Sequence, residues 1–137
     1  MDSVIVEEKL ESLRRCITRI ELRRAVSVTA PMADADVQDI IVLNLTRAIQ
    51  LCIDIGAHII SQEESESPRS MGEVFDVLAG LDRISETTAV AMHKAVGFRK
   101  IAVHNYGEIS WEVVQAISHH RLNDFRQFAQ EVAKLLP

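Results

Sequence analysis

Apolar residues recur with the period of an α-helix along most of this chain, and this feature restricts the fold most strongly. Between Val6 and Ile20 they are spaced by 4, 3, 4 and 3 residues, which places them on one face of a helix of about five turns. No segment alternates apolar and polar residues as a half-buried strand does. We therefore expect an all-α protein.

The breaks in this pattern predict where the helices begin and end. Pro31 interrupts a helix, and Gly107 is a natural C-terminal stop. Polar residues that can cap a helix N-terminus precede the later helices: Asp34, Ser70, Ser85 and Ser110. The predicted helices span residues 3–24, 35–61, 70–81, 85–105 and 110–137. They predict a single domain, residues 1–137, folded as an antiparallel bundle of four long helices and one short helix.

Two helices carry further predictions about packing. Helix 35–61 is apolar on most of its circumference, so we expect neighbours on several sides and part of its surface buried in a two-fold dimer. In helix 85–105 the spacing predicts that Ala89, Met92, Val96 and Val103 face inward.

Composition limits the classes of function. The net charge of -5 gives no overall attraction to nucleic acid, so RNA contacts would require a local basic surface. Cys16 and Cys52 lack the spacing of a metal site and are expected to be buried apolar residues. Neither a signal peptide nor a membrane-spanning run is recognisable, so we expect a cytoplasmic protein with no membrane partner.

The segment 97–107 (GFRKIAVHNYG) concentrates side chains capable of chemistry at one helix end. It holds Arg99, His104 and Tyr106, the only tyrosine of the chain. On a straight helix Arg99 and His104 are about 140° apart, and His104 and Tyr106 about 200° apart. The three converge only if the helix unwinds at Asn105 and Gly107, or if a symmetric dimer joins two copies of the segment.

These residue types suit the cleavage of RNA. Histidine transfers protons near neutral pH, and arginine binds phosphate and stabilises developing negative charge. Together they are sufficient for metal-free attack of a ribose 2′-hydroxyl on the adjacent phosphate. The structural alternative is that Arg99 is a solvated helix residue, His104 ends the helix and Tyr106 packs on the surface. A polar line on helix 35–61 that includes Asp54 either borders this site or is a solvated stripe.

The segment resembles the motif of HEPN-domain proteins, in which Arg, four residues, His, one residue and Tyr follow one another. It is most similar to HepT-type toxins encoded beside a minimal nucleotidyltransferase antitoxin. Flanking stretches also match: 44–58, 68–75 and 97–99. The sequence departs from related proteins at Lys100, where a small polar residue such as Asn is common.

The resemblance implies a dimeric, metal-independent endoribonuclease that needs no cofactor. It assigns catalysis to Arg99 and His104 at the dimer interface. We expect Asp54, Lys100 and Asn105 to be supporting residues of the cleft. It implies RNA as substrate, a homodimer or higher oligomer, and the nucleotidyltransferase as partner, which silences the toxin by transferring AMP to Tyr106. The alternative is a non-catalytic helical module that presents a surface or a modifiable tyrosine to that partner.

Overall fold

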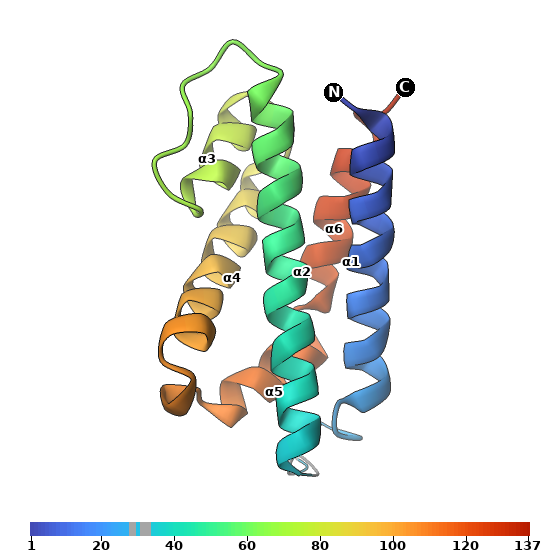
Figure 1. Cartoon of the computed structure of the whole chain (residues 1–137), viewed down its shortest axis with the longest axis vertical. Coiled ribbons are helices and arrows are strands. Elements are labelled where there is room, and N and C mark those ends of the chain that lie inside the picture. Colours follow the sequence, from blue (N-terminus) through green and yellow to red (C-terminus); the bar gives the residue numbers. More distant parts are fainter. Residues whose placement is uncertain (28–29, 31–33) are drawn as a thin grey trace.

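The computed structural model describes residues 1–27, 30 and 34–137, and the elements within them are helices. The long helices of the bundle are α1 (Ser3–Arg23), α2 (Ala35–Ser61) and α4 (Glu86–His104); α3 (Glu73–Gly80) is short. After a 3-10 turn, η1 (Tyr106–Glu108), the chain continues as α5 (Trp111–His120) and α6 (Leu122–Ala133). Figure 1 shows α1, α2, α4 and α6 running alternately down and up, with both termini at one end of the bundle. The predicted all-α bundle is confirmed.

The predicted helix caps have their expected partners. The side chains of Asp34 and Ser85 accept hydrogen bonds from backbone N–H groups in the first turns of α2 and α4, and the Ser110 side chain does the same for α5. The Ser70 hydroxyl accepts from the N–H of Glu73 at 3.2 Å, before α3. Pro31 lies outside the described residues. Local polar residues therefore fix where these helices start.

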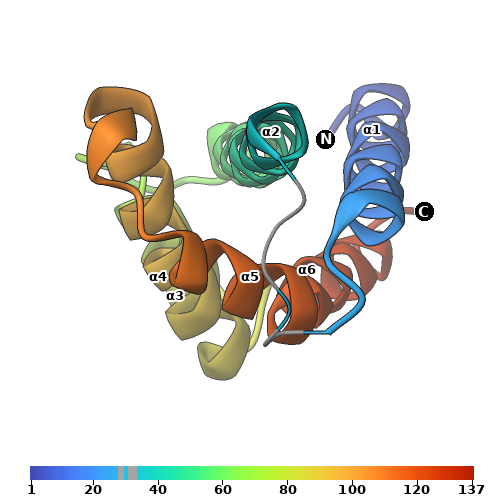
Figure 2. The same cartoon turned by 90° about the horizontal axis from the view of Figure 1, so that it is seen from below.

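The last predicted helix, 110–137, is wrong in one respect, because the structure divides it into α5 and α6. Arg121 leaves helical geometry at φ -116° and ψ 2°, and its guanidinium pairs with Asp124 at 2.9 Å. Apolar spacing continues across this break, and no proline or glycine marks it. Figure 2 shows the consequence: α5 crosses the end of the bundle before α6 turns along it.

Helix α2 lies at the centre and contacts α1, α3, α4, α5 and α6. By length and composition it could cross a membrane, but 56% of its most apolar window is buried inside the bundle. It is the central helix of the bundle. Cys16 and Cys52 are buried as predicted, and Phe75 of α3 meets Phe128 of α6 edge to face, with ring centroids 5.7 Å apart.

Close packing of α2 on α3 depends on Gly56. A Cβ atom built there would lie 2.5 Å from Val74 Cγ1 and 3.0 Å from Leu78 Cδ1. These contacts leave no room for a side chain and hold α3 close against α2. The position of α3 matters for the site, because the turn before it forms one wall of a pocket.

Candidate functional site

Helix α4 carries the motif residues, and its inward face is mostly as predicted. Ala89, Met92 and Val96 are buried. The prediction for Val103 is wrong: its side chain is 51% exposed, and Ala102 is buried instead. The apolar face of α4 therefore turns away from the core as the helix approaches its C-terminus.

Arg99, Lys100 and His104 line one pocket of about 370 Å³. The opposite wall is the turn 70–72, which precedes α3, and His93 lines the pocket from nearly two turns nearer the start of α4 than Arg99. The Arg99 guanidinium Nη1 lies 3.2 Å from the Met71 sulfur. The structure thus brings the predicted catalytic pair, Arg99 and His104, to a common basic pocket.

The helix unwinds directly after His104. Unwinding here was one of the two arrangements predicted for this segment. Asn105 has φ -139° and ψ 55°, and its N–H donates to the Ile101 carbonyl at 2.8 Å, which closes the last turn. Its own carbonyl accepts from the N–H of Glu108 at 2.8 Å in the 3-10 turn. The break redirects the chain, so that Tyr106 does not continue the helical spiral of α4.

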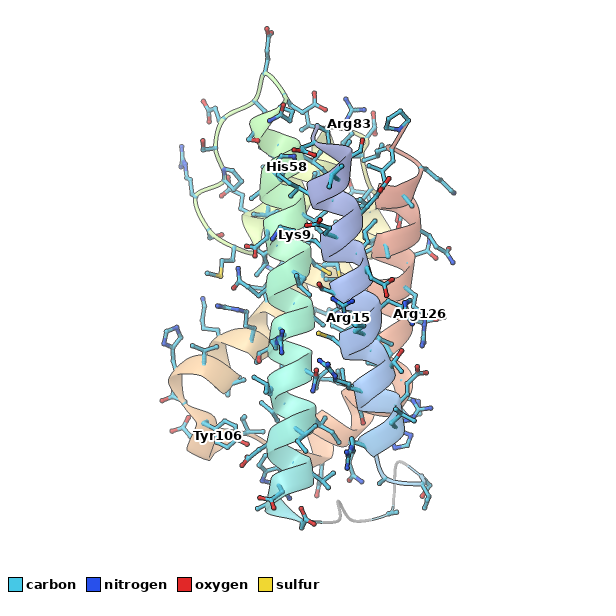
Figure 3. All side chains as sticks on the ribbon, turned by 45° about the vertical axis from the view of Figure 1, so that its right-hand side comes forward. Lys9, Arg15, His58, Arg83, Tyr106 and Arg126 are labelled. Atoms are coloured by element: carbon cyan, nitrogen blue, oxygen red, sulfur yellow. The ribbon has the colours of Figure 1, made fainter. Side chains whose placement is uncertain are left out.

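Tyr106 is held against α2 rather than in the pocket. Its hydroxyl donates a hydrogen bond to the carboxylate of Asp39, near the start of α2. Its ring meets Trp111 edge to face, with centroids 6.0 Å apart, so Trp111 packs on the motif turn as an aromatic support. Figure 3 shows Tyr106 between this turn and the lower part of α2.

The surroundings of Tyr106 keep its hydroxyl neutral. Burial raises the pKa of Tyr106, and the hydrogen bond to Asp39 and the negative charge of that carboxylate raise it further, to about 12. The side chain is nevertheless 41% exposed. Its hydroxyl is thus within reach of solvent but occupied by one acidic partner.

Two of the predicted supporting residues lie outside this pocket. Asp54 is half-buried on α2 and accepts a hydrogen bond from Gln50 at 2.8 Å. One turn farther along α2, His58 Nε2 accepts from the Asp2 N–H at 3.1 Å, beside the start of α1 (Figure 3). Within one chain, Asp54 thus bonds within α2 and His58 bonds to the start of α1. Asn105 shapes the end of α4 without lining the pocket, and only Lys100 of the predicted supporting residues lines it.

Sequence reasoning missed two acidic residues near the site. Asp39 is 67 positions from Tyr106, and Asp76 pairs with His93, with Oδ2 and Nδ1 3.3 Å apart. Both contacts arise from tertiary packing, so no spacing in the sequence predicts them. Among residues 1–27, 30 and 34–137 no group of three or more His, Cys, Asp or Glu side chains is placed to hold a metal ion.

The fold and the pocket define a class of protein: an all-α bundle with an Arg and His pair at one helix end and a tyrosine on the following turn. A family model for HepT-like ribonucleases matches residues 6–132. The chain belongs to this HepT-like ribonuclease family. Over 128 residues it is 35% identical to the mRNA nuclease HepT of Shewanella oneidensis, covering 93% of this chain and 95% of that protein.

Solved structures of toxin–antitoxin complexes share the fold. The tri-AMPylated HEPN toxin of Shewanella oneidensis, solved in complex with MNT antitoxin, has a TM-score of 0.85 at 33% identity and covers 98% of this chain and 99% of that one. A crystal structure of a toxin–antitoxin with AMP-PNP has a TM-score of 0.86 at 32% identity, covering 96% of this chain and 99% of that one. The resemblance seen in the sequence is confirmed at the level of family and fold.

Proposed function

We propose that this chain is the toxin of a toxin–antitoxin pair, an endoribonuclease whose catalytic residues are Arg99 and His104. The proposal rests mainly on the observation that both side chains line one pocket together with Lys100. Family membership and the relative described as an mRNA nuclease support RNA as the substrate. The proposed place of action is the cytoplasm, where the RNA lies.

The reaction uses groups that the RNA and the protein supply. The ribose 2′-oxygen attacks the adjacent phosphorus while its proton leaves, and the bond from phosphorus to the 5′-oxygen breaks as that oxygen gains a proton. His104 serves proton transfer, and Arg99 stabilises the added negative charge on the phosphate oxygens. The products are a 2′,3′-cyclic phosphate and a free 5′-hydroxyl. The scheme requires no metal ion.

We further propose that two copies of the chain assemble around this site. Apolar side chains surround the motif on the surface: Ile101 is 46% exposed, Val103 51% and Met71 42%. An apolar surface beside a polar pocket is typical of an interface. In a two-fold dimer a second Arg99 and His104 would face the same RNA phosphate, which provides both an acid and a base.

Tyr106 is the proposed acceptor of AMP from a minimal nucleotidyltransferase partner. The tyrosine oxygen attacks the α-phosphorus of ATP, the bond to the β-phosphate oxygen breaks, and pyrophosphate leaves as the hydroxyl proton is lost. The relative solved in an AMPylated form with MNT antitoxin supports this switch. An AMP group on Tyr106 adds negative charge and bulk two residues after His104, where it competes with an RNA phosphate for Arg99.

Substitution of the two catalytic residues tests the nuclease. Arg99→Ala and His104→Ala are each expected to lower the rate of RNA cleavage at least about a hundredfold. Arg23→Ala and His120→Ala remove exposed side chains of the same types away from the pocket and serve as matched controls with unchanged rates. Cleavage that survives both motif substitutions contradicts the proposal.

The alternative is a non-catalytic module that presents this surface to the nucleotidyltransferase. The exposed apolar side chains around the motif favour it, since they fit a protein partner as well as a second copy. In this case the purified chain binds the partner but does not cleave RNA. Cleavage by the isolated chain that is lost in His104→Ala rules this alternative out.

A further inference from the structure

The pocket that holds Arg99 and His104 contains more basic groups than one phosphate can use. His93 and Lys100 also line it. At 100° per residue, His93, Lys100 and His104 lie within about 40° of one another on α4 and so form a line. From the helical rise, His93 and His104 are about 16 Å apart along the axis. This separation exceeds the reach of hydrogen bonds to a common phosphate.

The line has an open space where a ligand would lie. Gly97 is on the same face, between His93 and Lys100, and a Cβ atom built on it would meet no other atom within 4 Å. The pocket wall is therefore basic at both ends, and between them it is formed by the uncharged residues Val96 and Gly97. An extended strand with regularly spaced negative charges fits this arrangement better than a compact ligand does.

His93 is fixed at one end of the line by α3 and the turn before it. Its Nδ1 lies 3.3 Å from Asp76 Oδ2, and its ring lies over Gly72, where an added Cβ would come within 3.0 Å of the ring atom Cε1. The carboxylate holds Nδ1, so Nε2 is the ring nitrogen that remains for a ligand.

We propose that Lys100 and His93 form a subsite for an RNA phosphate next to the one that is cleaved, with Asp76 and Gly72 as positioning residues for His93. This inference rests on the proposed nuclease function and names how its substrate is held. Lys100 contacts the strand beside the cleaved phosphate, and His93 contacts it farther along the pocket. The enzyme consequently favours single-stranded RNA with flanking phosphates over a dinucleotide.

Substrates with a single cleavable ribose separate the subsite from the chemistry. The short substrate is a dinucleotide with one phosphate, and the long one places the same ribose among 2′-deoxynucleotides that add flanking phosphates. His93→Gln and Lys100→Met are each expected to lower kcat/KM about tenfold on the long substrate, chiefly through KM, and less than about twofold on the short one. Asp76→Asn is expected to raise KM on the long substrate without lowering kcat. In a chain that already carries His93→Gln, Asp76→Asn is expected to cause no further rise in KM.

Lys94→Met is the matched control, because Lys94 is an exposed lysine of the same helix outside this pocket. It should leave both substrates unchanged. Equal losses on both substrates, or no loss on either, overturn the subsite. If the wild type cleaves neither substrate, the nuclease proposal fails, and the subsite is then judged by binding of an all-deoxy strand measured by fluorescence anisotropy. An about tenfold weaker affinity in His93→Gln supports it, and unchanged affinity overturns it.

Discussion

Replacing Asp39 with asparagine should make Tyr106 a stronger acid. The pKa of Tyr106 is raised to about 12, first by burial and then by the hydrogen bond and charge of Asp39. The substitution removes the charge but leaves the burial, so the pKa should fall part of the way toward the ordinary value of about 10. If it falls to about 11, then about half of the tyrosine is ionised at pH 11, against about one tenth in the wild type.

The assay is absorbance at 295 nm, where tyrosinate absorbs, on the folded protein between pH 8 and pH 11. Tyr106 is the only tyrosine of the chain, so the signal has one source. Far-UV circular dichroism on the same samples shows that the helices remain intact. Asp36→Asn is the matched control, because Asp36 is an exposed carboxylate in the first turn of α2, three residues before Asp39. It should leave the titration unchanged.

The same contact has a consequence for stability with a definite sign. Because the folded-state pKa lies above that of the unfolded chain, folding favours the neutral phenol, and this contribution is complete below about pH 10. It is lost as the pH rises toward the folded pKa of about 12. Asp39→Asn should weaken the pH dependence of the free energy of unfolding in this range, because it lowers the folded-state pKa of Tyr106. Identical titrations of Tyr106 in the wild type and in Asp39→Asn would show that Asp39 does not raise the pKa of Tyr106.

Further predictions concern the packing and the remaining titratable groups. Gly56→Ala should lower the free energy of urea unfolding by about 1–2 kcal/mol, because overpacking outweighs the gain in helix propensity, while Gly80→Ala, which has open space, should not destabilise. Burial alone would raise the pKa of Glu131, but hydrogen bonds from Thr88, Ser85 and Gln127 lower it overall. Glu131→Gln should therefore cost about 1–3 kcal/mol at pH 7, and the difference should shrink as the pH falls below about 4, which urea titrations at both pH values would reveal. Burial raises the pKa of the Cys16 and Cys52 thiols, so a thiol reagent should modify them only in denaturant; rapid modification of the native protein contradicts their burial.

Much of the fold follows from local sequence signals. Helix α2 begins after Asp34 and ends at Ser61, as its apolar pattern and cap predict. The division between α5 and α6 was not predictable in the same way, because Arg121 can continue a helix and the apolar spacing does not change there. That break depends on how the last two helices pack across the end of the bundle. Periodicity therefore predicts helical content better than helix direction.

The candidate site was predictable where its residues are close in sequence. Arg99, Lys100 and His104 lie within six positions and meet in one pocket. The contact between Tyr106 and Asp39 joins the end of one helix to the start of another, and periodicity gives no information about such pairs. Asp54 is the opposite case. It was predicted to support the site, but its side chain bonds to Gln50 of α2 and does not line the pocket.

The nuclease and its switch are tested together by expressing the chain alone and with the proposed nucleotidyltransferase partner and ATP, and by comparing intact mass, the modified residue and cleavage of cellular RNA. The unmodified chain is expected to cleave RNA, and cleavage is expected to stop as the mass increases by AMP on Tyr106. In Tyr106→Phe, which retains the ring, AMP should not be added and the partner should no longer stop cleavage by modification. Absence of cleavage by the unmodified chain, or full cleavage by chains that carry AMP on Tyr106, would show that the chain is not a nuclease silenced in this way.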